Sequence, residues 1–323
     1  MTTEEILSEE KNRFVLYPVK YDKIWKMYKT AVSSFWTTEE IDFSKDINDW
    51  SQKLNDNERF FISNILAFFA GSDGIVNENL SARFLNEVMI PEAKAFYGFQ
   101  IAIEFIHSET YSLMIDTFIK DNVEKDRLFN AIQTIPCIQR KAEWALRWIE
   151  NKEAAFSMRL IAFAIVEGIF FSGAFCSIFW LKERGLMPGL CMSNEFISRD
   201  EGLHTEFAIL LYSMIHDRLS QEMVFDVVKD AVDIEIEFIT DSIPCALLGM
   251  NAELMQEYIR FVADRLLTQL GYDKLYNAKN PFPFMDRINL EHKTNFFENR
   301  ESNYSKAKVG QKNVYEFSIN ADF

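Results

Sequence analysis

One stretch limits what this chain can fold into more than any other: "LIAFAIVEGIFFSGAFCSIFWL", Leu160 to Leu181, which is nearly all apolar. Its length suits a membrane-spanning helix. However, it contains Glu167, an unpaired carboxylate is costly in hydrocarbon, and we find no comparable second stretch. A helix that is apolar on all sides equally suits the centre of a large soluble bundle. We therefore predict no membrane partner, and a buried Glu167 that needs a polar or charged partner.

The rest of the composition favours helices around such a core. Of 323 residues 48% are apolar, whereas only 11 are glycine and 7 are proline, so helix breakers are few. This predicts an all-α fold with a large core. The periodicity predicts helices over Tyr21–Ser34, Asn57–Met89, Pro91–Ile119, Val123–Ile135, Ile138–Glu150, Ala154–Glu183, Asn194–His216, Gln221–Ile243 and Ala252–Leu270.

Charge and cysteine content narrow the possible partners and the compartment. The net charge of −15 opposes binding to a nucleic-acid backbone or an anionic membrane. The first residues lack the basic and apolar regions of a secretory signal. The four cysteines are scattered, which is typical of a reduced, cytoplasmic chain with buried thiols: Cys137, Cys176, Cys191 and Cys245.

A Glu-x-x-His motif occurs twice. In "EFIHSETY" the residues Glu104, His107 and Tyr111 lie at helical offsets of about 300° and 700°, so all three project from one side of a helix. In "EGLH" the pair Glu201 and His204 repeats the spacing. Glu–His pairs at this spacing are common on protein surfaces. The neighbouring residues must therefore decide whether the motif marks a functional site.

The surroundings of both motifs are apolar, and two further acidic residues share that setting. Asp73 follows "FISNILAFFA", and Glu167 lies in the most apolar segment. Two helices that each give Glu-x-x-His and two that each give one carboxylate form the di-metal arrangement of helical bundles. Two divalent cations would cancel the charge of the four carboxylates in a buried site. Oxygen and imidazole ligands without thiolate favour iron or manganese.

Tyr111 lies one helical turn beyond His107. Its phenol is therefore near enough to the predicted metal site to lose an electron and a proton to it. A tyrosine that only packs in the core would occupy the same helical position, and the spacing alone does not separate the two interpretations.

The chain also resembles a known family, the small, radical-generating subunit of class I ribonucleotide reductase of the eukaryotic and poxviral kind. The resemblance extends from about Arg13 to Phe323 and rests on long segments in the family's order. These are "FWTTEEIDFSKDINDW", "LAFFAGSDGIVNENL", "FYGFQIAIEFIHSETYSLMIDTFIKD", "VEGIFFSGAFCSIFWLKERGLMPGL", "NEFISRDEGLH", "HKTNFFE" and "FSINADF".

The resemblance implies a role for each matching position. It places the metal ligands at Asp73, Glu104, His107, Glu167, Glu201 and His204 and the radical at Tyr111. It implies an apolar shield around the radical at Phe171, Phe175 and Ile197, although plain core packing would account for the same residues. It implies a long-range electron route through Trp36, His107, Asp200 with its neighbour Arg199, and Tyr304.

The resemblance implies an enzyme subunit that is active only together with a large subunit. Two ferrous ions would react with oxygen and oxidise Tyr111, and the radical would pass to a large subunit that reduces ribonucleoside diphosphates. The resemblance further implies a ferritin-like bundle over residues 1–285, with additional helices, that forms a homodimer. A flexible tail over residues 286–323 would dock the large subunit. No glycine-rich phosphate loop occurs in the sequence, in agreement with a nucleotide site on the partner.

Three other functions fit parts of the pattern. A di-iron oxygenase or desaturase would use the same ligands beside a substrate pocket, a ferritin-like store would assemble into a cage, and a helical scaffold would bind no metal. The sequence also departs from the family at three positions. Phe105 and Gly71 are expected to alter the hydrogen bonds around the ligands, and Asn320, in place of a frequent acid, is expected to alter partner affinity.

Overall fold

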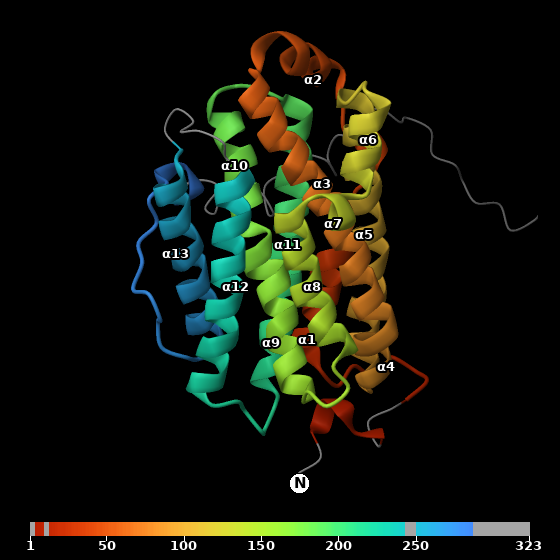
Figure 1. Cartoon of the computed structure of the whole chain (residues 1–323). Coiled ribbons are helices and arrows are strands. Elements are labelled where there is room, and N and C mark those ends of the chain that lie inside the picture. The colour runs from red at the N-terminus through yellow and green to blue at the C-terminus, as the bar shows by residue number, and fades with distance from the viewer. Residues whose placement is uncertain (1–3, 10–12, 243–249, 287–323) are drawn as a thin grey trace, which may run out of the picture. The chain divides into compact units, whose positions relative to one another are not determined.

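The structure is a computed structural model, and it describes residues 4–9, 13–242 and 250–286. These residues contain helices and no β-strand, as predicted (Figure 1). The longer helices are α1 (Asp22–Ser33), α3 (Asp56–Asn79), α5 (Pro91–Phe118), α6 (Asn122–Phe129), α8 (Pro136–Glu150), α9 (Phe156–Ile165), α10 (Ser172–Glu183), α11 (Pro188–Ser213), α12 (Gln221–Ser242) and α13 (Ala252–Leu270).

Short helical elements complete the described chain. The four-residue helix α7 (Ala131–Thr134) follows α6, and α4 (Leu85–Glu87) precedes α5. Three further elements connect α1 to α3, and none of them was predicted: η3 (Thr38–Glu40), α2 (Ser44–Asn48) and the π-helical turn η4 (Asp49–Lys53). The short helix η1 (Glu5–Leu7) lies near the N-terminus, and the π-helical turn η5 (Leu80–Phe84) joins α3 to α4.

Local sequence signals explain where helices α3 and α5 begin. At α3, Asn55 accepts a hydrogen bond from the Glu58 amide while the Glu58 side chain accepts one from the Asn55 amide, which is a capping box. At α5, Pro91 occupies the first helical position, where its missing N–H costs nothing. The α3–α5 pair packs along much of its length and forms one side of the core.

The helix α11 begins at Pro188, six residues before the predicted start at Asn194. Its first turn is held by a distant carboxylate, because Asp46 accepts hydrogen bonds from the amides of Gly189 and Leu190 at 2.8 and 2.7 Å. An anion at a helix N-terminus pairs with the unsatisfied amides there. The apolar periodicity of the helix does not reveal this contact with a distant residue, so the predicted start was too late.

The apolar segment that dominates the sequence forms one rod of three parts. Helices α9 and α10 are joined by the π-helical turn η6 (Val166–Phe170), which contains Glu167. The sequence predicted a single uninterrupted helix over Ala154–Glu183, and the π-turn is a departure from it. Such turns insert one extra residue into a helix and often occur at functional sites.

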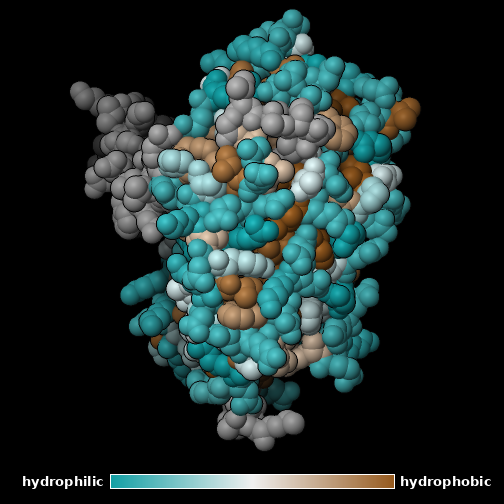
Figure 2. All heavy atoms as spheres, turned by 60° about the vertical axis from the view of Figure 1, so that its left-hand side comes forward, coloured by the Kyte–Doolittle hydropathy of each residue, from teal (hydrophilic) through white to brown (hydrophobic). Residues whose placement is uncertain are grey.

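Two helical stretches are long and apolar enough to cross a membrane, Asp56–Glu87 and Phe156–Glu183. The expectation that the chain has only one such stretch was therefore wrong. Their most apolar windows are 67% and 89% buried inside the protein, as in core helices. Hydrophilic residues cover most of the face drawn in Figure 2. Both stretches are accounted for by the core of the bundle.

The chain divides into two compact units, Met1–Phe282 and Pro283–Phe323. The first unit contains every helix named above, and Figure 1 shows its long helices lying side by side around α9 and α11. The division lies close to the expected domain boundary at residue 285, but a docking role for the second unit stays a prediction. The cysteines Cys137, Cys176 and Cys191 are buried free thiols, and Cys245 lies outside the described residues.

Candidate metal centre and radical site

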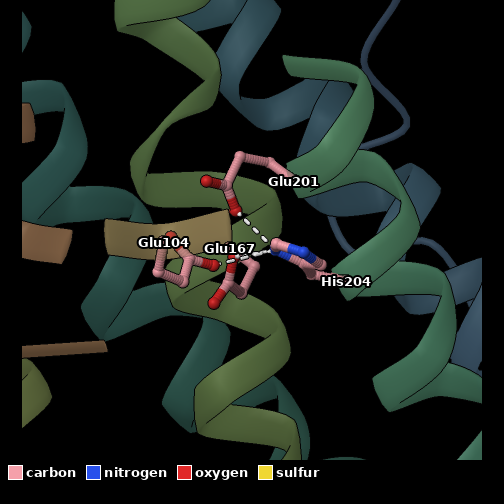
Figure 3. Close-up of side chains that lie close together, drawn as sticks. All are labelled: Glu104, Glu167, Glu201 and His204. Atoms are coloured by element: carbon pink, nitrogen blue, oxygen red, sulfur yellow. Dashed lines mark hydrogen bonds and ion pairs between the residues drawn. The ribbon is translucent and has the colours of Figure 1, made fainter. Parts of the chain in front are cut away.

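The six predicted metal ligands converge at the centre of the bundle. Each is at most 3% exposed, and they come from four rods: Asp73 on α3, Glu104 and His107 on α5, Glu167 on η6, and Glu201 and His204 on α11. Figure 3 shows Glu104, Glu167 and Glu201 pointing toward His204. The predicted gathering of these side chains is therefore observed.

The ligand atoms form two overlapping groups. Glu104, Glu167, Glu201 and His204 offer ligand atoms within 4.8 Å of one another, and so do Asp73, Glu104 and His107. The nitrogen His204 Nδ1 lies 2.9 Å from Glu104 Oε1 and 3.2 Å from Glu201 Oε2, and His107 Nδ1 lies 3.1 Å from Glu201 Oε1. Glu104 belongs to both groups, so a carboxylate stands between two potential cation positions.

The buried acids and histidines of the cluster shift one another's pKa values. Burial and the nearby Glu201 charge raise the pKa of Glu167 well above its usual range. Burial alone would raise the pKa of Glu201, but hydrogen bonds with Glu167, His107 and His204 outweigh it and lower the pKa. Burial opposes charge on both histidines, yet their carboxylate neighbours raise the pKa of each well above 6.5.

Several buried carboxylate oxygens have no hydrogen bond within the described part of the chain. These are Asp73 Oδ2, Glu104 Oε1 and Glu167 Oε2, although the last two lie 2.9 and 3.6 Å from His204 Nδ1 as charged contacts. Buried polar atoms left in this way need an explanation. Buried carboxylate oxygens and imidazole nitrogens that gather in this way fit divalent iron or manganese.

Trp36, Asp200 and His107 form a continuous chain of contacts beside the cluster. Trp36 Nε1 donates a hydrogen bond of 2.8 Å to Asp200 Oδ2, and His107 Nε2 lies 3.3 Å from the same oxygen. The Trp36 and His107 rings also stack, with centroids 5.8 Å apart. Arg199 holds the other oxygen, Asp200 Oδ1, at 3.0 Å. Burial opposes the charge on Asp200, but the bond with His107 and the Arg199 charge lower its pKa.

Tyr111 is 1% exposed, and its hydroxyl has no hydrogen-bond partner among the described residues. Burial raises the pKa of Tyr111 well above 10, and the Asp73 charge raises it further. The Tyr111 ring stacks on Phe69 with centroids 4.5 Å apart and planes 10° apart. The phenol is therefore buried, kept neutral, and within the electrostatic influence of the cluster.

Two of the three expected shield residues pack against Phe69, the ring partner of Tyr111. Phe171 and Phe175 pack against Phe69 with centroid distances of 5.7 and 5.1 Å, and Ile197 is buried on α11. Phe69, which touches Tyr111 directly, was not predicted. It stands four residues before Asp73 on α3, so the shared helix face was a signal available in the sequence.

Other positions differ from expectation or lie beyond the described residues. Gln100, on α5, donates to Glu167 Oε1 at 3.4 Å and was missed, although it precedes Glu104 by one helical turn. Phe105 is 63% exposed and faces away from the cluster, so the expectation that it alters the ligands' surroundings was wrong. A Cβ on Gly71 would lie 3.0 Å from the Ile132 side chain. Tyr304 and Asn320 lie outside the described residues.

Fold and site together define a helical-bundle protein with a buried carboxylate–histidine cluster that could hold metal. The chain belongs to the ribonucleotide reductase small-chain family: residues 13–281 match the family described as "Ribonucleotide reductase, small chain". It is therefore a small subunit of ribonucleotide reductase, an oxidoreductase.

Individual relatives agree with this assignment. The chain is 64% identical to the ribonucleoside-diphosphate reductase small chain of Neurospora crassa, over 95% of this chain and 75% of the relative. It is 58% identical to that of vaccinia virus (strain Ankara), over 99% of this chain and 100% of the relative. The solved structure of the ribonucleotide reductase Rnr4 homodimer from Saccharomyces cerevisiae is 41% identical, with a TM-score of 0.80 over 93% of this chain and 92% of that chain.

Proposed function

We propose that this small subunit holds two metal ions and uses them to form a radical on Tyr111, which it passes to a large subunit. The observation that carries the proposal is the pair of ligand groups that share Glu104. Asp73, Glu104 and His107 would hold one ion, and Glu104, Glu167, Glu201 and His204 the other. Two iron ions, or manganese in their place, would supply oxidising power from oxygen.

The surroundings of Tyr111 favour a neutral radical. Burial and the Asp73 charge disfavour a phenolate, so the electron and the hydroxyl proton must leave together. The hydroxyl has no hydrogen-bond partner among the described residues, so no neighbouring group there is placed to return a hydrogen atom to it directly. Phe69 stacks on the ring, and Phe171 and Phe175 pack against Phe69, so this apolar group would keep water from the radical.

The stack of Trp36 on His107, and their shared Asp200 oxygen, support a route for the electron. Asp200 accepts from Trp36 Nε1 and lies within hydrogen-bond distance of His107 Nε2, which fixes both rings relative to each other. Arg199 neutralises the remaining charge of Asp200. We propose that an electron enters through Trp36 and His107 while Asp200 holds the indole proton.

We further propose a homodimer and a large-subunit partner. The Rnr4 structure from Saccharomyces cerevisiae is described as a homodimer, and its likeness to this chain supports the same assembly here. A tail over residues 286–323 that docks the large subunit, with Tyr304 as the relay across it, rests on the family resemblance. The cytoplasm is the proposed compartment.

Electron paramagnetic resonance at low temperature tests the radical. Metal-free protein is loaded with ferrous iron without oxygen and then exposed to oxygen. We expect a tyrosyl signal in the wild type and none in Tyr111→Phe, while both bind two iron ions per chain. Tyr97→Phe is the matched control, because Tyr97 is also buried on α5 with a hydroxyl that lacks a partner in the described chain. A signal that survives in Tyr111→Phe would contradict the assignment.

A further inference from the structure

A second buried ion pair lies outside the metal centre. Lys141 on α8 and Glu235 on α12 are 1% and 0% exposed, and Lys141 Nζ lies 2.5 Å from Glu235 Oε2. Burial lowers the pKa of Lys141 to about 8 and raises the pKa of Glu235 to about 7. No step proposed above uses either side chain.

The Lys141 ammonium also contacts the π-turn η6, helix α3 and a second residue of α12. It donates a hydrogen bond of 2.6 Å to the carbonyl oxygen of Phe170, the last residue of η6. It also lies over the rings of Phe68 on α3 and Phe238 on α12, 3.5 and 4.0 Å from their centroids. One cation therefore ties α8, α3 and α12 to the end of the π-turn.

The carboxylate of the pair contacts the same rod just beyond the turn. A Cβ on Gly173, in the first turn of α10, would lie 2.8 Å from Glu235 Oε1. Glu235 is therefore packed against backbone at residue 173, while Lys141 is bonded to backbone at Phe170. The two charged groups hold the rod on the C-terminal side of η6, and Glu167 lies within that turn.

Stability is a poor explanation for such a pair. The cost of taking two charges out of water often equals or exceeds their attraction, and well-packed apolar residues can replace a buried pair without loss. A π-turn, in contrast, departs from the regular helical ladder and needs outside contacts to fix it. The Lys141–Glu235 pair supplies such contacts at Phe170 and Gly173, next to the turn whose backbone orients the Glu167 side chain.

We propose that Lys141 is a positioning residue that, with Glu235, fixes the π-turn Val166–Phe170 and so aims the Glu167 carboxylate at its metal position. The inference rests on the proposed function, because Glu167 is a ligand only if the cluster binds metal. Glu167 belongs to one of the two ligand groups, whereas Asp73 and His107 belong to the other. Loss of the Lys141 contact therefore weakens one ion and spares the other.

The test is a titration of metal-free protein with Mn²⁺ alone, in which free Mn²⁺ is followed by its electron paramagnetic resonance signal. The variants are Lys141→Met and the double variant Lys141→Met/Glu235→Leu, which leaves no charge unpaired. Arg13→Met is the matched control, since it removes the cation from another buried carboxylate, Glu92 at the start of α5. Hydrogen exchange of residues 166–172 is measured on the same metal-free samples.

We expect the wild type and Arg13→Met to bind two Mn²⁺ per chain. Lys141→Met should bind one with unchanged affinity and the second about 10- to 100-fold more weakly, the usual effect of losing a contact that orients a ligand. The double variant should recover stability but keep both the weak second site and faster exchange at residues 166–172. That combination separates a positioning role from simple neutralisation of Glu235.

Two outcomes would overturn the inference in different ways. If the wild type binds two Mn²⁺ and the double variant does so with the same affinities, the pair does not position Glu167, and the proposed metal centre is untouched. If the wild type binds no Mn²⁺, the metal centre itself is wrong and the inference fails with it.

Discussion

Trp36 and Asp200 are 164 positions apart in the chain, yet the indole nitrogen donates a hydrogen bond of 2.8 Å to the carboxylate. Trp36 is 2% exposed, so this bond is made away from water, where it is stronger than at the surface. The same carboxylate oxygen faces the His107 ring. The bond joins the segment after α1 to the face of α11 that carries Glu201 and His204, and Trp36 is held in one orientation.

Replacing Trp36 with phenylalanine keeps an aromatic ring but removes the donor to Asp200. We expect the tyrosyl signal on Tyr111 to form, and ribonucleotide reduction in the presence of the large subunit to fall to background. Loss of a bond to a charged group should lower the free energy of unfolding by about 1–3 kcal/mol. Radical yield, reduction rate and urea unfolding measure the three effects separately.

Trp25→Phe is the control for that experiment, because Trp25 lies on α1 and packs against Tyr17 and Tyr28 without touching Asp200. It should reduce ribonucleotides at the wild-type rate. Normal turnover in Trp36→Phe would show that the electron does not pass through Trp36.

The overlap of the two ligand groups predicts unequal effects of ligand mutations. Glu104→Gln should weaken both Mn²⁺ ions, since Glu104 belongs to both groups, whereas Asp73→Asn should weaken mainly one. Metal that binds only the folded chain stabilises it by about 2.7 kcal/mol at one hundred times its dissociation constant. Thermal unfolding with and without Mn²⁺ should therefore show the smallest shift for Glu104→Gln. Equal shifts in the two variants would contradict the shared role of Glu104.

Gly189, in the first turn of α11, has no room for a side chain. A Cβ there would lie 2.6 Å from the backbone oxygen of Asp42, and backbone cannot swing aside as a flexible side chain can. Gly189→Ala should cost about 1–3 kcal/mol of unfolding free energy. Gly98→Ala on α5 is the control: a Cβ there meets nothing within 4 Å, and the variant should gain about 0.5–1 kcal/mol. Urea unfolding measures both, and a neutral Gly189→Ala would show that α11 can shift away from Asp42.

The buried Lys141–Glu235 pair should impose a distinctive pH dependence on stability. The Glu235 carboxyl keeps its proton up to pH about 7 when folded and loses it near 4.5 when unfolded, so its contribution to stability falls between those values. The Lys141 ammonium loses its proton near pH 8 when folded and near 10.5 when unfolded, so its contribution rises between those values.

We therefore compare the free energy of unfolding of the wild type with that of Lys141→Met/Glu235→Leu. The difference, wild type minus variant, should be smallest between pH 7 and 8. Urea unfolding of metal-free protein at pH 5, 7.5 and 10 measures the difference. A difference that stays constant across this range would mean that neither group changes its pKa on folding.

The gathering of the proposed ligands could be predicted from sequence because helical spacing is local. Glu104 and His107 share a helix face by counting alone, and an apolar setting marks Glu167 as buried. Contacts between distant segments could not be read in that way. The start of α11 depends on Asp46, and periodicity in α11 does not register a carboxylate from another helix.

The π-turn was missed for a different physical reason. A segment that is apolar on all sides has no polar face, so one extra residue in a turn changes nothing in its pattern. In the structure, Lys141 donates a hydrogen bond to Phe170 and Gln100 donates one to Glu167 within this turn. Neither contact could be inferred from the apolar pattern. Phe69 shares a face of α3 with Asp73, but that spacing places it only near the cluster and does not show that its ring meets Tyr111.

The burial of the rod from Phe156 to Glu183 has a consequence for how the chain is made. The helices that cover it include α11 and α12, which follow it in the sequence. Although α3 and α8 also contact the rod and precede it, the nascent chain leaves this apolar stretch only partly covered until residues beyond 240 have been synthesised. During that interval it would be a target for chaperones and for the machinery that inserts membrane segments.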